Sequence, residues 1–329
     1  MERKMKVMNM VNALNQALDL KLADDPKVLV YGEDVGVEGG VFRITEGLQK
    51  KHGVKRVFDT PLAESAIVGT AVGMAVAGLR PVVEMQFSGF AYPALNQIIS
   101  HVSRMRNRSR GKYGSQMVIR MPYGGGINAL EHHSESLEAM YSHFPGLKVV
   151  IPSTPADAKG LLIAAIESDD PIIFMEPKRI YRAIKQEVSE EKYSIPIGKA
   201  KVLTVGTDVT LVAYGAMIRE ARKAVALAKE SGISVELIDL RTIYPVDKET
   251  LVNSIKKTGR FISVNEGHSN AGIGAELIAM ANEEAFLYLE APPKRVAGFD
   301  TIVPLPKGEH HYMITPEKIF YEIERTVKY

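Results

Sequence analysis

The stretch from Leu62 to Leu79 constrains the fold most, because it contains one ionisable side chain, Glu64, among apolar, small and hydroxyl residues. Gly69 and Gly73 stand one helical turn apart, so the pattern predicts a thin, buried helix with another backbone close against it. Glu64 would lie in its first turn, where free N–H groups and the helix dipole favour a carboxylate. If buried, that carboxylate needs a partner or a changed protonation state. The pattern equally allows an exposed carboxylate at the lip of a core helix.

Composition excludes several classes of protein. The chain has 329 residues, enough for two domains, and its 41 basic and 39 acidic residues nearly cancel, which indicates neither nucleic acid nor a membrane surface as partner. It has no cysteine, so disulfides, thiolate catalysis and cysteine-bound clusters are excluded on this chain. Apolar residues near the N-terminus follow helical spacing rather than a solid run, which argues against a secretory signal and predicts a cytoplasmic location.

Strand and helix patterns alternate in two series. The first predicts strands at 27–31, 81–85, 117–120, 147–151 and 171–175, with helices near 46, at 92–105 and at 155–167. The second predicts strands at 209–213, 234–238 and 261–264, with helices at 217–230, 248–257 and 272–284. Such alternation predicts an α/β protein of two doubly wound domains, each a parallel sheet covered on both faces.

A charged, Pro- and Gly-containing stretch interrupts this alternation between Lys178 and Gly206. Such a stretch is typical of an interdomain connection. We therefore expect a first domain over 1–185, a linker over 186–205 and a second domain over 206–329.

The segment around His133 is a second candidate for chemistry. Adjacent His132 and His133 cannot both point into one site from a regular element, and no third ligand lies at zinc-like spacing, so no metal site is expected on this chain. Ser134 is a good N-cap, with Glu135 and Glu138 in the following turn. His133 would then precede a helix start, where the dipole keeps the imidazole neutral and available for proton transfer. A surface histidine in a loop is the alternative.

Five motifs together resemble the beta subunit of thiamine-diphosphate-dependent 2-oxo acid dehydrogenases, the pyruvate and branched-chain decarboxylating components. They are Asp59–Glu64, Glu84–Phe90, His133–Ser136, Pro145–Ser153 and Asp239–Pro245. The resemblance runs from about residue 5 to the C-terminus. It implies a thiamine-diphosphate pyrimidine-binding domain, then a transketolase-type C-terminal domain, in an assembly of two alpha and two beta chains.

The resemblance also implies roles for particular residues. Glu64 matches the carboxylate that hydrogen-bonds the aminopyrimidine ring of thiamine diphosphate, and Phe90 matches the aromatic residue stacked on that ring. Leu62 and Gln86 match residues near the ring. His133 matches the active-site histidine, which would assist transfer of the acyl group to the lipoyl group of the dihydrolipoyl acyltransferase core.

Other positions bear on the partner chain. Glu33 matches an acidic residue near a polar tunnel between two active sites, whereas Pro93 and Asn96 stand where some bacterial relatives carry acids. The family binds magnesium and the cofactor's diphosphate through a Gly-Asp-Gly motif, which this chain lacks. The resemblance assigns that motif to the alpha subunit, so this chain would supply half of each active site and be active only with that partner.

The preferred substrate is a finer question. The segments Glu176–Arg182 and Ala291–Ala297 look closer to branched-chain enzymes, and 150–155 also suits pyruvate enzymes, so a branched-chain 2-oxo acid is favoured with pyruvate second. The alternatives are a subunit of acetoin dehydrogenase or of a transketolase-like thiamine enzyme, and a non-catalytic scaffold of the complex. Glu64 and His133 together argue against the scaffold.

Overall fold

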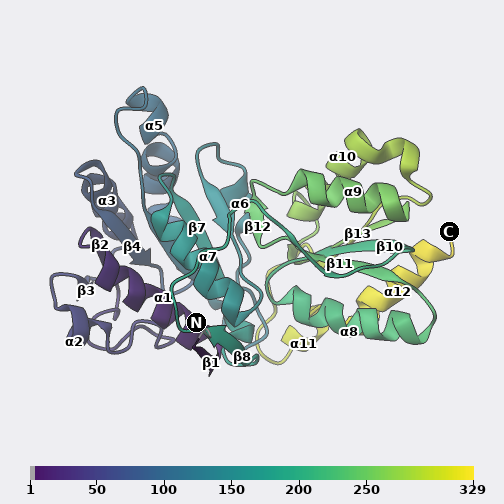
Figure 1. Ribbon diagram of the computed structural model, residues 1–329, viewed down its shortest axis with the longest axis horizontal. Coiled ribbons are helices and arrows are strands. Elements are labelled where there is room, and N and C mark those ends of the chain that lie inside the picture. The colour runs from purple at the N-terminus through teal and green to yellow at the C-terminus, as the bar shows by residue number, and fades with distance from the viewer. Residues whose placement is uncertain (1–3) are drawn as a thin grey trace.

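The computed structural model describes residues 4–329 and contains two α/β domains, each built on its own sheet (Figure 1). The first sheet has seven strands in the order β12-β6-β7-β5-β4-β2-β3. Their bounds are β2 Val28–Gly32, β3 Val57–Asp59, β4 Arg80–Glu84, β5 Val118–Tyr123, β6 Lys148–Val150, β7 Ile172–Pro177 and β12 Thr242–Tyr244. All neighbours are parallel except β12, which pairs antiparallel with β6 although it follows three elements of the second sheet in the chain.

The second sheet has the order β14-β13-β10-β11-β9. Its strands are β9 Lys201–Thr204, β10 Val209–Ala213, β11 Val235–Asp239, β13 Phe261–His268 and β14 Lys294–Gly298. Helices α8 (Met217–Glu230) and α12 (Pro316–Val327) cover one face, and α9 (Lys248–Thr258) and α10 (Ile273–Ala285) cover the other (Figure 1). The expected doubly wound α/β fold is therefore confirmed.

The segment 186–205, expected to link the domains, carries a strand at each end. Strand β8 (Gln186–Ser189) pairs with β1 (Met5–Met8) beside the first domain, whereas β9 pairs antiparallel with β11 of the second sheet. The buried ammonium of Lys159 donates to the carbonyl oxygens of Ser189 and Glu191, which ties β8 to the first domain.

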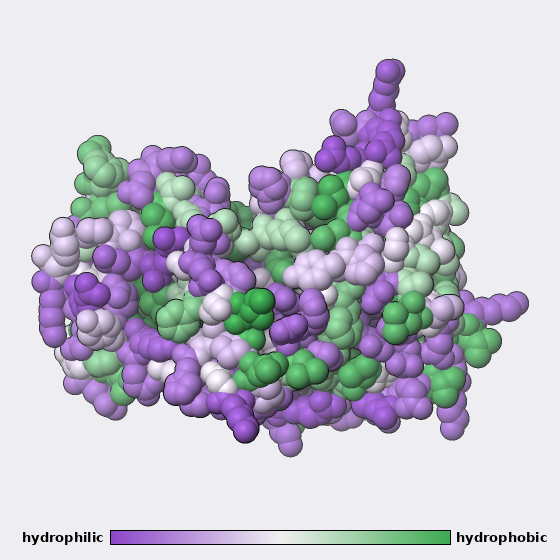
Figure 2. All heavy atoms as spheres, turned by 180° about the vertical axis from the view of Figure 1, so that it is seen from behind, coloured by the Kyte–Doolittle hydropathy of each residue, from purple (hydrophilic) through white to green (hydrophobic). Residues whose placement is uncertain are grey.

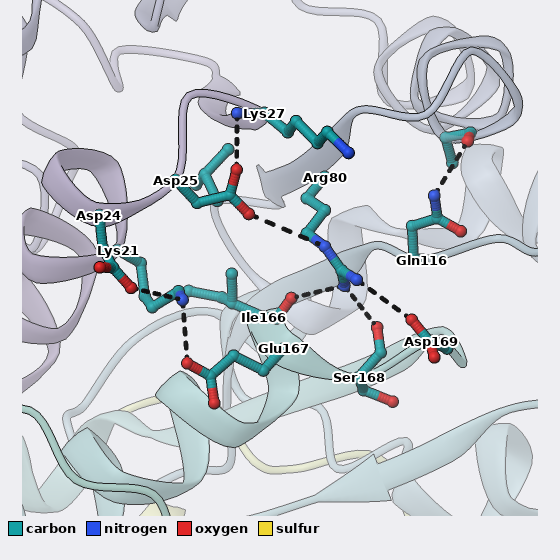
Figure 3. Close-up of polar contacts among 12 residues, drawn as sticks. Lys21, Asp24, Asp25, Lys27, Arg80, Gln116, Ile166, Glu167, Ser168 and Asp169 are labelled. Carbon is teal, nitrogen blue, oxygen red and sulfur yellow. Dashed lines mark hydrogen bonds and ion pairs between the residues drawn. The ribbon is translucent and has the colours of Figure 1, made fainter.

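Helices α1 (Met10–Asp24) and α7 (Pro155–Glu167) lie together on one face of the first sheet (Figure 1). Arg80, at the start of β4, donates to the carbonyl oxygens of Ile166 and Ser168 at the end of α7 (Figure 3). Lys21 of α1 pairs with Glu167 at 2.9 Å in the same view. Cationic groups thus bind the unsatisfied carbonyls and the negative dipole end of α7.

The helix expected over 92–105 is wrong as a single element. The segment consists of a 3₁₀ turn η2 (Tyr92–Ala94), α4 (Leu95–Gln97), a π-turn η3 (Ile98–Val102) and α5 (Met105–Arg108). The carbonyl of Ile99 accepts hydrogen bonds from the side chains of Ser103 and Arg104. These side-chain donors compete with the backbone for the carbonyl and interrupt the regular helical ladder.

Helix α3 (Glu64–Val76) is only half buried, so the expectation of a buried helix with another backbone against it is wrong for this chain alone. One side packs into the core through Ile67, Val68, Ala71 and Ala75. The opposite side is exposed and made of small residues: Ala66, Thr70, Gly73 and Ala77. A Cβ built on Gly73 would meet no atom of the described part of the chain within 4 Å.

The first sheet has a buried ionic centre at β4, β5 and β7. Arg120 donates to both carboxylate oxygens of Glu176, at 2.8 and 3.0 Å, and to Glu84 at 2.7 Å. Tyr181 donates its hydroxyl to Glu176 at 2.6 Å. These bonds satisfy the charges that burial would otherwise make costly.

The surface seen from behind is mainly hydrophilic, with hydrophobic residues scattered over it (Figure 2). Among residues 4–329, no helix has both the length and the apolar character needed to cross a membrane.

Candidate active site

The candidate site lies at the carboxyl ends of β2, β4 and β5, the edge of a parallel sheet where ligands usually bind. Glu64 begins helix α3, and its N-cap residue, Ala63, makes no side-chain capping bond. The expected position of Glu64 in the first helical turn is therefore confirmed, and its side chain is half-buried. Leu62, in the preceding loop, is 79% exposed in this chain and packs against no core.

A second carboxylate, Glu33, follows β2 and faces the same space as Glu64. Glu33 is buried, and its Oε1 has no hydrogen-bond partner among the described residues. Burial, followed by the negative charges of Glu64 and Asp34, raises the pKa of Glu33 to about 7. The two carboxylates therefore interact electrostatically, although no direct bond joins them.

The segment after β4 supplies the aromatic wall. Gln86 donates its Nε2 to Asp34 Oδ2 at 2.9 Å, which links the ends of β4 and β2. The 3₁₀ turn η1 (Ser88–Phe90) then brings Phe90 against Phe87, with ring centroids 5.4 Å apart and planes inclined by 74°. Edge-to-face packing of this kind holds both rings in place.

His133 packs into this wall from the loop after β5. It ends the 3₁₀ turn η4 (Glu131–His133), and its ring centroid lies 4.5 Å from that of Phe87 and 5.0 Å from that of Phe90. Its Nδ1 is buried and has no partner among the described residues. His132 is exposed and packs its ring against Tyr92 instead, at 6.2 Å.

The expected capping role of Ser134 is wrong. Helix α6 (Glu138–Ser142) begins four residues later, with Leu137 at its N-cap, and the buried Ser134 hydroxyl donates to the carbonyl of Leu130. The pKa of His133 is nevertheless lowered, first by burial and then by the positive charge of Lys178. The neutral imidazole thus results from its surroundings rather than from a helix dipole.

A close approach of backbones fixes this loop against the aromatic segment. A Cβ built on Gly89 would lie 2.2 Å from the carbonyl oxygen of His132, so only glycine fits there. Ser88 Oγ also donates to the carbonyl of Glu135 at 2.9 Å. The segment that carries Phe90 and the loop that carries His133 are therefore held as one unit.

Sequence reasoning missed Lys178, which immediately follows β7. Its side chain is 4% exposed, and burial lowers its pKa to about 8 despite the nearby carboxylates of Glu266 and Glu309. Its place in Glu176–Arg182, directly after a predicted strand, was the available signal. Glu266 and Glu309 lie in the second domain, and no local pattern placed them near Lys178.

The arrangement combines a carboxylate at a helix start, an aromatic surface and a neutral imidazole. Such a site can bind a planar heterocycle, exchange a proton with its edge and move a second proton near the imidazole. Within residues 4–329, no group of three His, Cys, Asp or Glu side chains is placed to hold a metal ion.

Known proteins match this chain over nearly its whole length. Residues 6–184 match the transketolase pyrimidine binding domain, and residues 198–319 match the transketolase C-terminal domain. The chain is 58% identical over 324 residues to the pyruvate dehydrogenase E1 component subunit beta of Acholeplasma laidlawii, covering 98% of this chain and 99% of that protein. It is 50% identical to the subunit of the same name from Mycoplasma pneumoniae over 320 residues (97% and 98%) and to that from Staphylococcus epidermidis over 325 residues (99% and 100%).

Among solved structures, an inactive beta4 tetramer of a split-gene transketolase superposes with a TM-score of 0.80. It is 22% identical and covers 98% of both chains, so this likeness concerns the fold alone.

Proposed function

Since this chain belongs to the family of beta subunits of thiamine-diphosphate-dependent 2-oxo acid dehydrogenases, we propose that it acts with an alpha subunit in the oxidative decarboxylation of pyruvate. The acyl group would pass to a lipoyl group on the acyltransferase core. The observation that carries the proposal is that His133 packs against Phe90 after β4, while Glu64 begins α3 close enough to Glu33, after β2, to act on its charge.

The choice of pyruvate rests on the relatives. Those compared above are named as pyruvate dehydrogenase subunits, at 50 to 58% identity over nearly the whole chain. The branched-chain preference expected from Glu176–Arg182 and Ala291–Ala297 has no support from these comparisons. It remains a competing outcome of the substrate test.

The residues present fit the pyrimidine half of the cofactor. Glu64 would bind the edge of the aminopyrimidine ring and Phe90 would stack on its face, with Leu62 and Gln86 beside it. Among residues 4–329, the buried atoms Glu33 Oε1 and His133 Nδ1 have no hydrogen-bond partner, and buried polar atoms are usually bonded, to a ligand or water where not to protein. The exposed side chain of Leu62 also suits a site that a further molecule completes.

Thiamine diphosphate, when bound, supplies an electron sink for the loss of carbon dioxide from a 2-oxo acid. The carboxylate of Glu64 would hold a proton at the ring edge. Phe87 and Phe90 would exclude water from the space beside that edge. His133, kept neutral by burial, could take up a proton at an imidazole nitrogen and deliver it to the sulfur that leaves the lipoyl disulfide.

The alpha subunit would complete the site. This chain lacks the Gly-Asp-Gly motif, so we propose that the partner holds the magnesium ion and the diphosphate, and that two alpha and two beta chains assemble. The exposed small-residue face of α3 supports a close neighbour at that helix, because small residues let backbones approach.

The test is reconstitution with the alpha subunit encoded by the same source, followed by a turnover screen. Pyruvate, branched-chain 2-oxo acids and acetoin are offered with thiamine diphosphate, magnesium and a lipoyl domain. Lipoyl acylation that is fastest with pyruvate supports the proposal. A preference for a branched-chain acid or for acetoin would reassign the substrate. A complex that assembles but turns over none of these compounds would favour the alternative, a non-catalytic scaffold.

A further inference from the structure

The loop that carries His133 is closed at its base within the first domain. The N–H of Gly124 donates to the carbonyl of Glu135 at 2.9 Å, so residues 124–135 leave β5 and return to the same point. His133 lies near the returning end. The rest of the loop extends toward the second domain, and three of its backbone N–H groups donate to carboxylates there.

Two carboxylates of the second domain hold the outgoing part of this loop. Glu266 of β13 accepts the N–H of Gly125 at 2.5 Å. Glu309, the first residue of helix α11 (Glu309–Tyr312), accepts the N–H of Gly126 at 2.6 Å on Oε1 and that of Asn128 at 2.7 Å on Oε2. Both carboxylates are at most 5% exposed. Hydrogen bonds from backbone N–H groups to buried carboxylates are among the stronger ones in proteins.

Three residues of the loop have positive φ, and only one of them, Asn128, is not a glycine. Gly124 and Gly126 lie at +83° and +84°, and Asn128 at +56°. A Cβ on Gly126 would come within 2.5 Å of Arg179 Cδ, and Arg179 in turn pairs with Glu220 of α8 at 3.1 Å. A non-glycine residue in the left-handed region persists where its surroundings hold it.

Two cations lie close to these carboxylates. Burial, the largest effect, and the like charge of Glu309 raise the pKa of Glu266, whereas the N–H of Gly125 and the positive charges of Lys178 and Arg179 lower it. Lys178 also faces His133. The group that gives the imidazole a positive neighbour is therefore the same one that offsets the two carboxylates.

We propose that Glu309, assisted by Glu266, is a positioning residue for His133. The C-terminal domain holds the outgoing part of the loop, residues 124–130, and thereby sets the position of the imidazole against Phe87 and Phe90. The expected effect on acyl transfer rests on the proposed function. The contact between Glu309 and the loop does not, because it is given by the hydrogen bonds from Gly126 and Asn128.

The sharpest variant is Glu309→Gln. The side chain keeps its size, but one acceptor oxygen becomes an NH₂ group that faces an N–H donor, so one of the two loop bonds is lost and replaced by repulsion. Glu266→Gln removes the charge at a residue with one loop bond and should act in the same direction more weakly. Asp208→Asn is the matched control, because Asp208 accepts the N–H of Ser234 at 2.7 Å in the same domain but has no bond to the loop.

Three measurements on the reconstituted alpha–beta complex test the proposal. Hydrogen exchange reports the amides of 124–128, and the rate of carbethoxylation reports His133, with His132 as internal reference. Reductive acylation of a lipoyl domain is compared with decarboxylation using an artificial electron acceptor. In Glu309→Gln we expect amide exchange about 10- to 100-fold faster, a changed His133 modification rate and an acylation rate about 10- to 100-fold lower. Decarboxylation should fall much less, and Asp208→Asn should match the wild type throughout.

Unchanged exchange and unchanged His133 modification in both Glu309→Gln and Glu266→Gln would overturn the proposal. A parallel loss of both activities with unchanged exchange would overturn it as well. If the wild-type complex shows no 2-oxo acid turnover, the proposed function fails, but exchange and modification still decide whether Glu309 holds the loop. If Glu309→Gln does not assemble, the same readouts on Glu266→Gln decide the matter.

Discussion

The imidazole of His133 stands edge-on to the ring of Phe90, with centroids 5.0 Å apart and planes inclined by 76°. The residue proposed to stack on the cofactor and the residue proposed to serve acyl transfer are thus in direct contact. Each is also packed against Phe87. A substitution at one of these three rings can therefore shift the other two, and each variant needs a control that detects such a shift.

Glu64→Gln should lower decarboxylation in the reconstituted complex by roughly two to four orders of magnitude, the range for removing a proton-transfer group. The amide keeps the shape of the side chain but cannot share a proton as a carboxylate does. The measurement is turnover with an artificial electron acceptor, with the exposed Glu187→Gln on β8 as control. Near-normal turnover in the Glu64 variant would contradict the role of Glu64 as the carboxylate that shares a proton with the cofactor.

His133→Ala should separate the two halves of the reaction. We expect it to retain much of the decarboxylation activity, while acylation of a lipoyl domain falls by about two orders of magnitude or more, because the leaving sulfur must be protonated. His132→Ala is the matched control and should be milder in both assays, since His132 packs on Tyr92 away from the wall. Equal loss of both activities in His133→Ala would instead assign it to substrate binding or decarboxylation.

The isolated chain should show no measurable affinity for thiamine diphosphate at micromolar cofactor, with or without magnesium. The reason is that it lacks the Gly-Asp-Gly motif, so the diphosphate would have no metal-bridged site. Isothermal titration calorimetry of this chain, compared with the reconstituted complex, checks the prediction. Tight, magnesium-dependent binding to the isolated chain would contradict the division of the site between two subunits.

Glu138 should make stability depend on pH. Its carboxyl lies buried between the domains, accepts the hydroxyl of Tyr214 at 2.9 Å on Oε1 and leaves Oε2 without a partner among the described residues. Burial raises its pKa to about 7 from an ordinary value of 4.5. Between these values the folded state binds more protons than the unfolded state, so the free energy of unfolding falls as pH rises from about 4.5 to about 7.

Glu138→Gln keeps an acceptor for Tyr214 and removes this titration. The variant should therefore gain stability relative to the wild type by roughly 2 to 3 kcal/mol on going from pH 5 to pH 8. Chemical unfolding of both proteins at the two pH values checks this, with the exposed Glu283→Gln as control. A difference between variant and wild type that does not change with pH would show that Glu138 is ionised throughout.

The sequence alone determined the α/β alternation and the position of Glu64. Both depend on local signals: hydrophobic periods of a strand or a helix, and breaks at Gly, Pro and charged residues. The helices predicted at 155–167 and 217–230 match α7 and α8, because the signals are local: a Thr154 cap begins α7, and α8 has amphipathic spacing. The combined motifs also identified the family, which the comparisons confirm.

Only the tertiary structure decided the surroundings of His133. Ser134 looks like an N-cap, yet no helix begins until Glu138, and its hydroxyl donates to the carbonyl of Leu130 instead. The outgoing part of the same loop is held by bonds to the second domain. Those bonds join residues 141 and 183 positions apart, as in Gly125 with Glu266 and Gly126 with Glu309. Local periodicity carries no information on contacts at such separations. The same holds for the exposed face of α3, because the small residues that predict close packing do not say whether the neighbour lies in this chain or in another.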